Sequence, residues 1–413
     1  MSEIVNKAQL LKKASLKLSE ASTKDKNDAL KLVGESLIAN KELILKENEK
    51  DIEQAIASQM KESLIDRLRL TEKRIQEMVE GIKTIIELKD PIWKSSEIWT
   101  IENGLNISKM TVPLGVVGII YESRPNVTVD AFSLTLKSGN CILLRGSSSA
   151  IHSNKALVAA IKEGLRKSNI SEDVIQLIEN TSRESVMEML KLNEYIDVII
   201  PRGGNSLIQL VVQNATVPTI ETGVGNCHVY IDKSAKLEDA VKIVVNAKTQ
   251  RPGVCNACET VLVHEDIANT FLPMMKDALK GIVELRGCDK TREVIDSVPA
   301  VEEDWAEEYL DYILAVKVVK DVDEAIEHIG KYGTMHSESI VTEDYSNAEK
   351  FLRKIDAAAV YVNASTRFTD GSVFGFGCEM GISTQKMHAR GPMGLNELVT
   401  IKYIIRGNGQ IRE

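Results

Sequence analysis

The chain has 413 residues, of which 43% are hydrophobic and 27% are charged, and its net charge is −9. This length exceeds what one hydrophobic core usually supports, so we expect two or three domains. The acidic balance and the lack of a dense Lys/Arg block argue against nucleic-acid binding.

The chain shows no membrane or export signal. Its longest apolar run, 112–121, is too short to span a bilayer, and the first twenty residues lack the continuous apolar core of a secretory signal. Six cysteines are too few for a disulfide scaffold. We therefore expect a cytoplasmic protein with free thiols that binds no membrane.

Residues 3 to about 90 carry apolar side chains at helical spacing and predict a group of helices. In 98–114, a Glu-Asn-Gly turn between two β-prone runs predicts a hairpin. Beyond Gly115 the pattern changes to short apolar runs that alternate with helical segments. The runs expected to be strands are 115–122, 140–146, 174–179, 196–204 and 216–223.

A second alternating block follows. Its expected strands and helices are 227–232, 236–249, 259–264, 267–280, 314–319, 321–333 and 357–365, with one more strand at 400–407. Strand and helix in alternation predict βαβ units and a doubly wound, mostly parallel sheet. No repeat or low-complexity linker separates the two blocks.

Two loops that follow expected strands, 145–149 and 201–206, carry small residues, hydroxyls and a cation just ahead of a helix. Backbone N–H groups at the start of a helix suit a phosphate. The dinucleotide fingerprint G-x-G-x-x-G is absent. Phosphate binding and ordinary turn chemistry both remain open for these loops.

Cys255 and Cys258 stand three residues apart after Arg-Pro-Gly. A zinc site would need about four ligands, and Cys227 and His228 could complete one, but no second Cys-x-x-Cys exists. A redox pair would stand at a strand-to-helix turn, whereas a strand is expected directly after Cys258. Cys255 could also act as a nucleophile, or both thiols could be structural. Cys258 is expected to point into packing.

Two further residues bear on this choice. Asn126 follows Pro125 at the end of an expected strand, where an amide can cap the next helix or donate to an oxyanion. Glu221 lies between the two α/β halves, 255 − 221 = 34 residues before Cys255.

The chain resembles the aldehyde dehydrogenase superfamily in the order of its motifs. These are Asn126, residues 138–150, Glu221, Cys255 and residues 374–383. Within this superfamily, the chain resembles the branch that acts on L-glutamyl 5-phosphate in four stretches, 121–128, 250–257, 361–384 and 388–395. The similarity covers essentially the whole chain. The resemblance implies NADPH-dependent reduction of L-glutamyl 5-phosphate to L-glutamate 5-semialdehyde and phosphate through a cysteine thioester. This reaction is the second step of proline biosynthesis from glutamate.

The resemblance also implies the architecture: two doubly wound α/β domains, a Rossmann-like cofactor domain and a catalytic domain, with a small β-arm for oligomerisation. The expected boundaries are 1–97 and 114–222 for the NADPH-binding domain, 223–366 for the catalytic domain, and 98–113 and 367–413 for the arm and C-terminal segment. A homo-oligomer, dimer or tetramer, and a transient contact with glutamate 5-kinase are further expectations.

The resemblance assigns roles to single residues. Cys255 is the nucleophile, and Asn126 is an oxyanion donor together with the Cys255 backbone N–H. Residues implied in cofactor binding are Arg145, Gly146, Ser147, Ser148, Gly203, Gly204 and Glu308. Residues implied in substrate binding are Arg124, Arg251, Ser365, Thr366 and Arg367, and no metal is expected.

Some of these assignments have a chemical reason. Hydrolytic relatives hold the adenosine ribose with a Lys and a following Glu, whereas residues 145–149 offer a cation and hydroxyls without a carboxylate, which favours NADPH over NADH. Leu310 stands where relatives have an aromatic residue near the Glu308 position. Arg251 is expected to favour the thiolate of Cys255. Rival functions are a hydrolytic dehydrogenase that uses Glu221 to activate water, a CoA-acylating reductase, and a binding or thiol-redox module without turnover.

Overall fold

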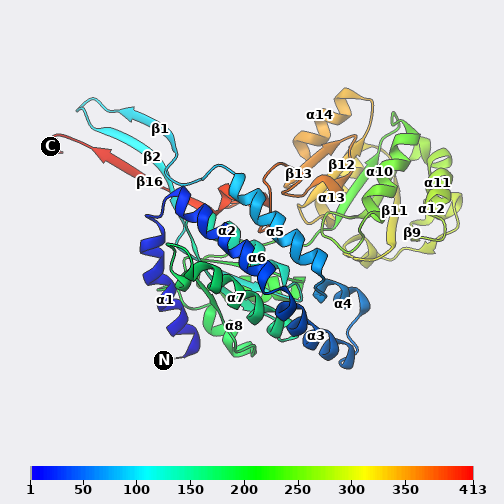
Figure 1. Ribbon diagram of the computed structural model, residues 1–413. Helices are drawn as coiled ribbons and strands as arrows, with labels where there is room; N and C mark the ends of the chain where they lie inside the picture. The colour runs from blue at the N-terminus through cyan, green and yellow to red at the C-terminus, as the bar shows by residue number, and fades with distance from the viewer. Residues whose placement is uncertain (1, 413) are drawn as a thin grey trace. The chain divides into compact units, whose positions relative to one another are not determined.

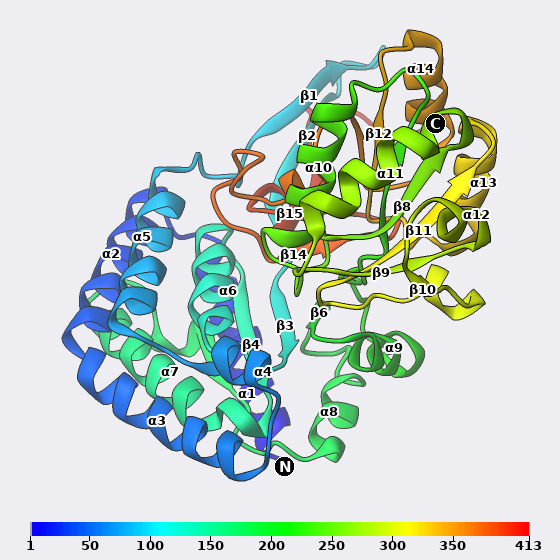
Figure 2. The same ribbon diagram turned by 90° about the vertical axis from the view of Figure 1, so that its right-hand side faces the viewer.

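The computed structural model describes residues 2–412, drawn in Figures 1 and 2. The described chain divides into two compact units. The first runs to Thr222 and includes Gly375–Gly381 and the residues from Met393 on, and the second comprises Gly223–Phe374 and Ile382–Pro392. The sequence grouped 367–413 as the arm and C-terminal segment; by contacts, residues 367–374 and 382–392 cluster with the second unit, and the expected domain boundaries stay a prediction.

The first unit opens with the expected helices, coloured blue to cyan in Figure 1. Three of them begin at a hydroxyl that caps the first turn, at Ser2, Ser22 and Thr71. Ser22, for example, accepts the Asp25 N–H, and the Asp25 side chain accepts the Ser22 N–H. The helices are α1 (Glu3–Leu18), α2 (Thr23–Ala39), α3 (Lys41–Ala57), α4 (Glu62–Leu68) and α5 (Glu72–Glu87). No helix in the described part of the chain is long and apolar enough to cross a membrane.

A four-stranded parallel sheet with the order β5-β4-β3-β6 forms the core of this unit. Its strands are β3 (Val116–Tyr121), β4 (Cys141–Gly146), β5 (Ile175–Leu177) and β6 (Val198–Arg202). The helices that follow them are α6 (Asn126–Lys137), α7 (Ile151–Arg166), α8 (Arg183–Met189) and α9 (Asn205–Asn214). The strand order reverses between β3 and β6, which makes the carboxyl ends of these two strands the switch point where ligands bind in such sheets.

One expected strand is wrong. In 216–223 only single bridge positions form, at Thr219, which pairs with Ile199, and at Thr222. The Ile199 N–H donates to the carbonyl of Pro218, and the Ile220 N–H donates back to Ile199. Proline has no N–H to give to a ladder, which limits pairing along this segment.

The hairpin expected at 98–114 is confirmed as β1 (Ser95–Thr100) and β2 (Asn106–Pro113). β16 (Val399–Arg406) pairs antiparallel with β2, so the arm is a three-stranded sheet, visible at one end of Figure 1. Directly opposed residues share a face of an antiparallel sheet. The register places these on one face: Trp99, Ile107, Ile401, Tyr403 and Ile405.

The second unit holds a seven-stranded parallel sheet with the order β10-β9-β11-β8-β7-β12-β13. Its strands are β7 (Cys227–Ile231), β8 (Cys258–His264), β9 (Glu284–Gly287), β10 (Val298–Pro299), β11 (Ile313–Val319), β12 (Ser337–Val341) and β13 (Ala359–Val362). Its helices are α10 (Leu237–Thr249), α11 (Glu265–Leu279), α12 (Asp289–Val294), α13 (Val322–Tyr332) and α14 (Tyr345–Lys354). A short pair, β14 (Gly381–Ser383) and β15 (Gly391–Met393), completes the strands.

Helices cover both faces of this sheet. Val229 and Ile231 of β7 pack in one hydrophobic cluster with α10 and α11, whereas Tyr230 between them packs in a second cluster with α13 and α14. This alternation follows from the period of two along a strand. Both units are thus α/β with parallel sheets, which confirms the expected fold class.

Helices α2 and α7 approach closely at Gly164. A Cβ at this position would lie 2.6 Å from the Val33 Cα and 2.9 Å from the Leu32 carbonyl oxygen. We expect Gly164→Ala to lower the free energy of unfolding by about 1–3 kcal/mol, because overpacking against a backbone outweighs the gain in helix propensity. Urea titration followed by circular dichroism measures the change.

Gly330 in α13 is the matched control, because a Cβ there meets nothing within 4 Å. Gly330→Ala should stabilise its own unit by about 0.5–1 kcal/mol. A Gly164→Ala variant as stable as the wild type would contradict the close packing.

Candidate active site

Cys255 lies in the loop between α10 and β8, at the amino end of the second unit's sheet. Its side chain is half-buried, whereas Cys227 at the start of β7 and Cys258 at the start of β8 are completely buried. Burial raises the pKa of both Cys227 and Cys258. Of these three thiols, Cys255 is therefore the most accessible.

The structure also bears on the possible zinc and redox roles. Among residues 2–412, no group of three or more His, Cys, Asp and Glu side chains is placed to hold a metal. All six cysteines are free, and the Cys258 Sγ donates to the Thr260 carbonyl at 3.3 Å within the core. Cys258 is thus packed as expected.

The backbone of Cys255 is held from the side of β7. The Cys227 Sγ donates to the Cys255 carbonyl at 3.2 Å. Gly225 lies against the same carbonyl so closely that a Cβ would overlap the oxygen. The Gly225 N–H in turn donates to Oε1 of Glu308 at 2.7 Å. The sequence placed Glu308 with the cofactor, and it offered no sign of this contact or of the role of Gly225.

Two of the expected arginines lie near Cys255. Burial and the neighbouring charge of Arg251 lower the pKa of Arg367, and the Cys255 thiolate acts in the opposite direction. Arg367 donates through Nε to Gln250 at 2.9 Å and through Nη1 to the Asn256 side chain. Arg251 is exposed. Two cations from two different loops, Arg251 and Arg367, therefore lie close to the thiol.

The hydroxyls expected to bind substrate are engaged within the protein. Ser365 is buried and accepts the Arg367 N–H at 3.3 Å, which caps a short 3₁₀ helix. Thr366 is completely buried and donates to the Asn256 carbonyl at 2.7 Å. In this structure both residues fix the Arg367 loop against the Cys255 loop, and direct substrate contact by them stays a prediction.

In the first unit, the expected phosphate loop at Gly203 and Gly204 lies at the switch point. Gly204 caps the start of α9, and its N–H donates to Oε2 of Glu122 at 2.9 Å. A Cβ on Gly203 would overlap the same carboxylate. Glu122 follows β3, so a carboxylate of the protein itself lies where the sequence suggested an anion.

Hydroxyls gather beside it at the carboxyl ends of β3 and β4. The Ser149 Oγ lies 2.6 Å from the Ser147 Oγ and 3.1 Å from the Ser123 Oγ. Ser148 starts a 3₁₀ turn that leads into α7. Small hydroxyl side chains at this edge suit a nucleotide cofactor. The sequence alone did not identify Ser123, because only the pairing of β3 with β4 brings it to this loop.

Arg145 is bound to backbone carbonyls within the first unit. Its guanidinium is buried and donates through Nη2 to the carbonyls of Thr181 and Ser182 at 2.6 and 2.9 Å, and through Nη1 to the Gly146 carbonyl at 3.3 Å. Burial lowers the pKa of Arg145. The guanidinium therefore binds the backbone next to the loop 145–149, and a direct contact with a cofactor phosphate stays a prediction.

Asn126 is the first residue of α6, and the N-cap position belongs to Pro125. A capping role for Asn126 is therefore excluded. The Asn126 amide donates to Oδ2 of Asp130, one turn later, at 2.9 Å. Burial raises the pKa of Asp130 to about 6, and the hydrogen bond from Asn126 and the charge of Arg202 act against this shift. This contact orients the exposed amide with its second N–H still able to donate.

Arg124 and Glu221, both half-buried, complete the expected residues of the first unit. Arg124 precedes the α6 N-cap, and its carbonyl accepts the Val127 N–H. Glu221 lies two residues before the boundary of the units.

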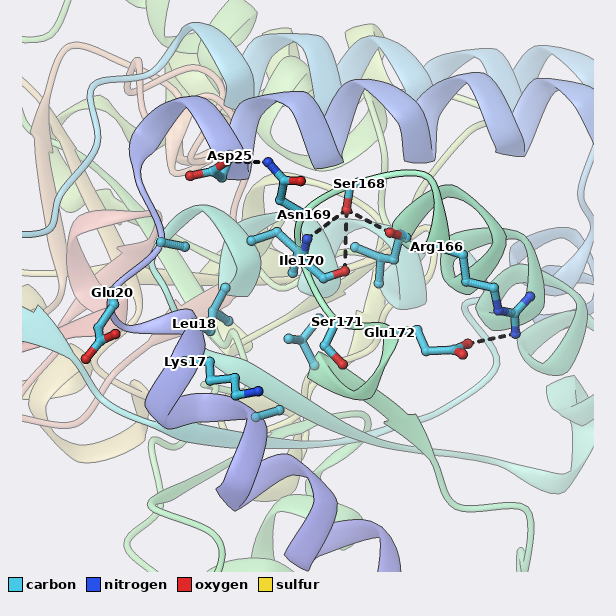
Figure 3. A pocket seen from close by; sticks show the side chains of 14 residues that line it. Lys17, Leu18, Glu20, Asp25, Arg166, Ser168, Asn169, Ile170, Ser171 and Glu172 are labelled. Carbon is cyan, nitrogen blue, oxygen red and sulfur yellow. Dashed lines mark hydrogen bonds and ion pairs between the residues drawn. The ribbon is translucent and has the colours of Figure 1, made fainter.

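A separate pocket of about 770 Å³ lies in the first unit, shown in Figure 3. It is lined by the ends of α1 and α7, the start of α2 and the segment that leads into β5. Within its lining, Arg166 pairs with Glu172 at 2.7 Å, and Asp25 accepts a hydrogen bond from the Asn169 amide at 3.0 Å. It borders the amino end of β5, opposite to the loops that follow the strands, and no expected site residue lines it.

Known proteins resemble this chain over its whole length. The sequence profile described as "Aldehyde dehydrogenase family" matches residues 11–313 and 291–404. Gamma-glutamyl phosphate reductase of Alkaliphilus oremlandii is 70% identical over 413 residues, and the protein of the same name from Alkaliphilus metalliredigens is 66% identical, each over 100% of both chains. The crystal structure of gamma-glutamyl phosphate reductase from Thermotoga maritima is 56% identical, covers 100% of both chains and gives a TM-score of 0.97.

Proposed function

Because the chain belongs to the aldehyde dehydrogenase family, we propose that it reduces L-glutamyl 5-phosphate to L-glutamate 5-semialdehyde and phosphate. NADPH is the proposed reductant, and the reaction serves proline biosynthesis in the cytoplasm. The observation that carries the proposal is the 70% identity over the whole length to a protein named gamma-glutamyl phosphate reductase. The half-buried thiol of Cys255, among buried neighbours, supports the role of nucleophile.

The Cys255 thiolate attacks the acyl carbon, and an S–C bond forms. The bond from that carbon to the phosphate oxygen breaks, and phosphate leaves without needing a general acid. A glutamyl thioester remains on Cys255. The Asn126 amide and the Cys255 backbone N–H are the proposed donors to the oxyanion, and the loss of one such donor typically costs about 10²–10³ in turnover.

Arg251 and Arg367 are the proposed ligands of the substrate's anionic groups. Guanidinium groups bind carboxylate and phosphate through paired hydrogen bonds. Arg367 is held by Gln250 and Asn256, so its position is set before substrate binds.

Membership of the family implies a nicotinamide cofactor, which when bound supplies a hydride to the thioester carbon. The hydroxyls of Ser147 and Ser148, in a loop without a carboxylate, support NADPH as the preferred form. The buried charge of Arg145, next to this loop, would attract the cofactor phosphate without touching it. For Glu308 the ribose contact expected from the sequence remains part of the proposal.

Phosphate dependence tests the reaction directly. Run in reverse from glutamate 5-semialdehyde, the reduction of NADP⁺, followed by absorbance, should require added phosphate and should not accept coenzyme A in its place. Cys255→Ala should abolish turnover because no thioester can form, whereas Cys258→Ser, in a core position, should keep most of it.

Oxidation without phosphate would contradict the proposal. If that activity also disappeared in Glu221→Gln, the enzyme would be a hydrolytic dehydrogenase in which Glu221 activates water. For a reductase, Glu221→Gln should keep forward turnover within about tenfold, or about 1.4 kcal/mol of barrier.

Cofactor choice should depend on the loop at Ser148. Ser148→Glu places a carboxylate where a 2′-phosphate is proposed, so the KM for NADPH should rise at least tenfold more than the KM for NADH. Initial rates with both cofactors measure this. Ser148→Ala is the control, because it removes the hydroxyl without adding charge. An equal loss for the two cofactors in Ser148→Glu would mean that the loop is structural.

The arm supports the proposal of a homo-oligomer. On the face of Trp99 and Ile405, the apolar side chains Trp99, Ile401, Tyr403 and Ile405 are exposed and Ile107 is half-buried, beside the Lys109–Glu97 ion pair; Tyr403 and Ile405 keep 55% and 59% of their surface. Monomers rarely leave a large contiguous apolar patch in water. A second copy of the chain is the proposed occupant, as a dimer or within a tetramer.

Ile405→Asp should shift the protein towards monomers in sedimentation analysis, because it buries a charge at the proposed interface. Arg406→Asp is the matched control, since Arg406 is the next residue along β16 and lies on the opposite face. If neither variant changed the sedimentation coefficient, or if both changed it equally, the apolar face of the arm would not be the interface.

A further inference from the structure

Glu308 reaches the nucleophile loop through a short series of contacts. Its Oε1 accepts the Gly225 N–H at 2.7 Å, and Gly225 lies directly against the Cys255 carbonyl oxygen. No other side chain would fit at Gly225 without moving that carbonyl. The position of the Glu308 carboxylate is therefore transmitted to the backbone of Cys255.

The segment that carries Glu308 is itself anchored. Leu310 has a φ of +54°, a left-handed conformation that a residue with a branched side chain rarely adopts. Its N–H donates to Oε1 of Glu259 at 3.2 Å. Glu259 follows Cys258 in β8, so the strained backbone is tied to the strand that leaves the nucleophile loop.

The same carboxylate is tied to the helix that enters the loop. Lys248 of α10 pairs with Oε2 of Glu259 at 2.5 Å, and both side chains are completely buried. Tyr309, the neighbour of Glu308 in the same segment, packs its ring under the Lys248 ammonium, with 5.8 Å between Nζ and the ring centroid. The Tyr309 hydroxyl donates to Oδ1 of Asp304 at 2.8 Å. Both ends of the Cys255 loop and the Glu308 segment thus share one buried anchor.

We propose that Glu308 is a positioning residue for Cys255: it holds Gly225, and through Gly225 it sets the position of the nucleophile before any cofactor binds. The inference rests on the proposed function only in taking Cys255 as the nucleophile. It adds a role within the chain itself to the cofactor contact expected of Glu308.

The test uses acylation of the cofactor-free enzyme by p-nitrophenyl acetate. The Cys255 sulfur forms a bond to the acetyl carbon, the ester bond breaks, and p-nitrophenolate leaves and is measured as a burst. Glu308→Ala should slow this burst about tenfold or more, since small displacements of a reacting group can cost up to about 10²-fold. Glu308→Gln should stay within about threefold of the wild type, because its amide oxygen still accepts the Gly225 N–H.

Alkylation by iodoacetamide, followed at Cys255 by mass spectrometry, separates positioning from access. It needs no oxyanion geometry, so Glu308→Ala should change its rate less than threefold. Glu307→Gln is the matched control, because Glu307 is the exposed neighbour and its loss should leave both rates unchanged. Cys258 should stay unreactive in every variant, which reports that the core is intact.

A wild-type burst in Glu308→Ala, with a raised KM for NADPH, would overturn the proposal and leave Glu308 as a cofactor ligand only. An equal slowing in Glu308→Gln and Glu308→Ala would also overturn it, because charge rather than the hydrogen bond would then matter. If Glu308→Ala exposed Cys258, the Glu308→Gln result alone would decide. The burst and the alkylation use neither the phosphorylated substrate nor NADPH, so these two measurements stand apart from the test of the overall reaction.

Discussion

The buried ion pair of Lys248 and Glu259 is the interaction on which the nucleophile loop depends. It joins the last turn of α10 to the second residue of β8, and the loop between them carries Cys255. Burial acts to raise the pKa of Glu259, and the charge and hydrogen bond of Lys248 act against this shift. Removing one partner of such a pair leaves an uncompensated buried charge, which typically costs about 3–5 kcal/mol. Glu259 also accepts the Leu310 N–H, so one carboxylate holds both the loop and the segment of Glu308.

At the switch point of the first unit, charged side chains bind backbone N–H and carbonyl groups at the ends of helices and strands. The start of α9 presents backbone N–H groups, and the Glu122 carboxylate satisfies one of them at Gly204. Nearby, Arg145 satisfies the carbonyls of Thr181 and Ser182. Ionised side chains of the protein thus balance the backbone dipoles at this edge, while the neutral hydroxyls of the serine loop remain at the surface between them.

Much of this architecture could be predicted, because the apolar periods of the strands and helices are strong. β12 was missed because its sequence, Ser-Glu-Ser-Ile-Val, looks polar. Its Glu338 is completely buried and accepts both the backbone N–H and the Nδ1 of His228 on β7, at 2.8 and 3.0 Å. Such a strand depends on a partner far away in the sequence, which periodicity cannot reveal.

The candidate site shows the same limit. The sequence left nucleophile, metal, redox and structural roles open for Cys255, and the difference in burial from Cys258 was needed to separate the two thiols. Likewise, the chemistry of Arg145 suggested a phosphate ligand, whereas two of its hydrogen bonds go to the carbonyls of Thr181 and Ser182, 36 and 37 residues away in the sequence. Residue type suggests candidate groups for a site, and tertiary contacts decide which of these side chains are exposed and which bind within the protein.

The apolar face of the arm has a thermodynamic consequence. If a second copy covers it, association and folding are linked by mass action, since the partner binds only the folded arm. For a dimer, each tenfold rise in protein concentration then favours the assembled state by about 1.4 kcal/mol. The melting temperature would therefore not be a fixed property of this chain but would rise with its abundance in the cell.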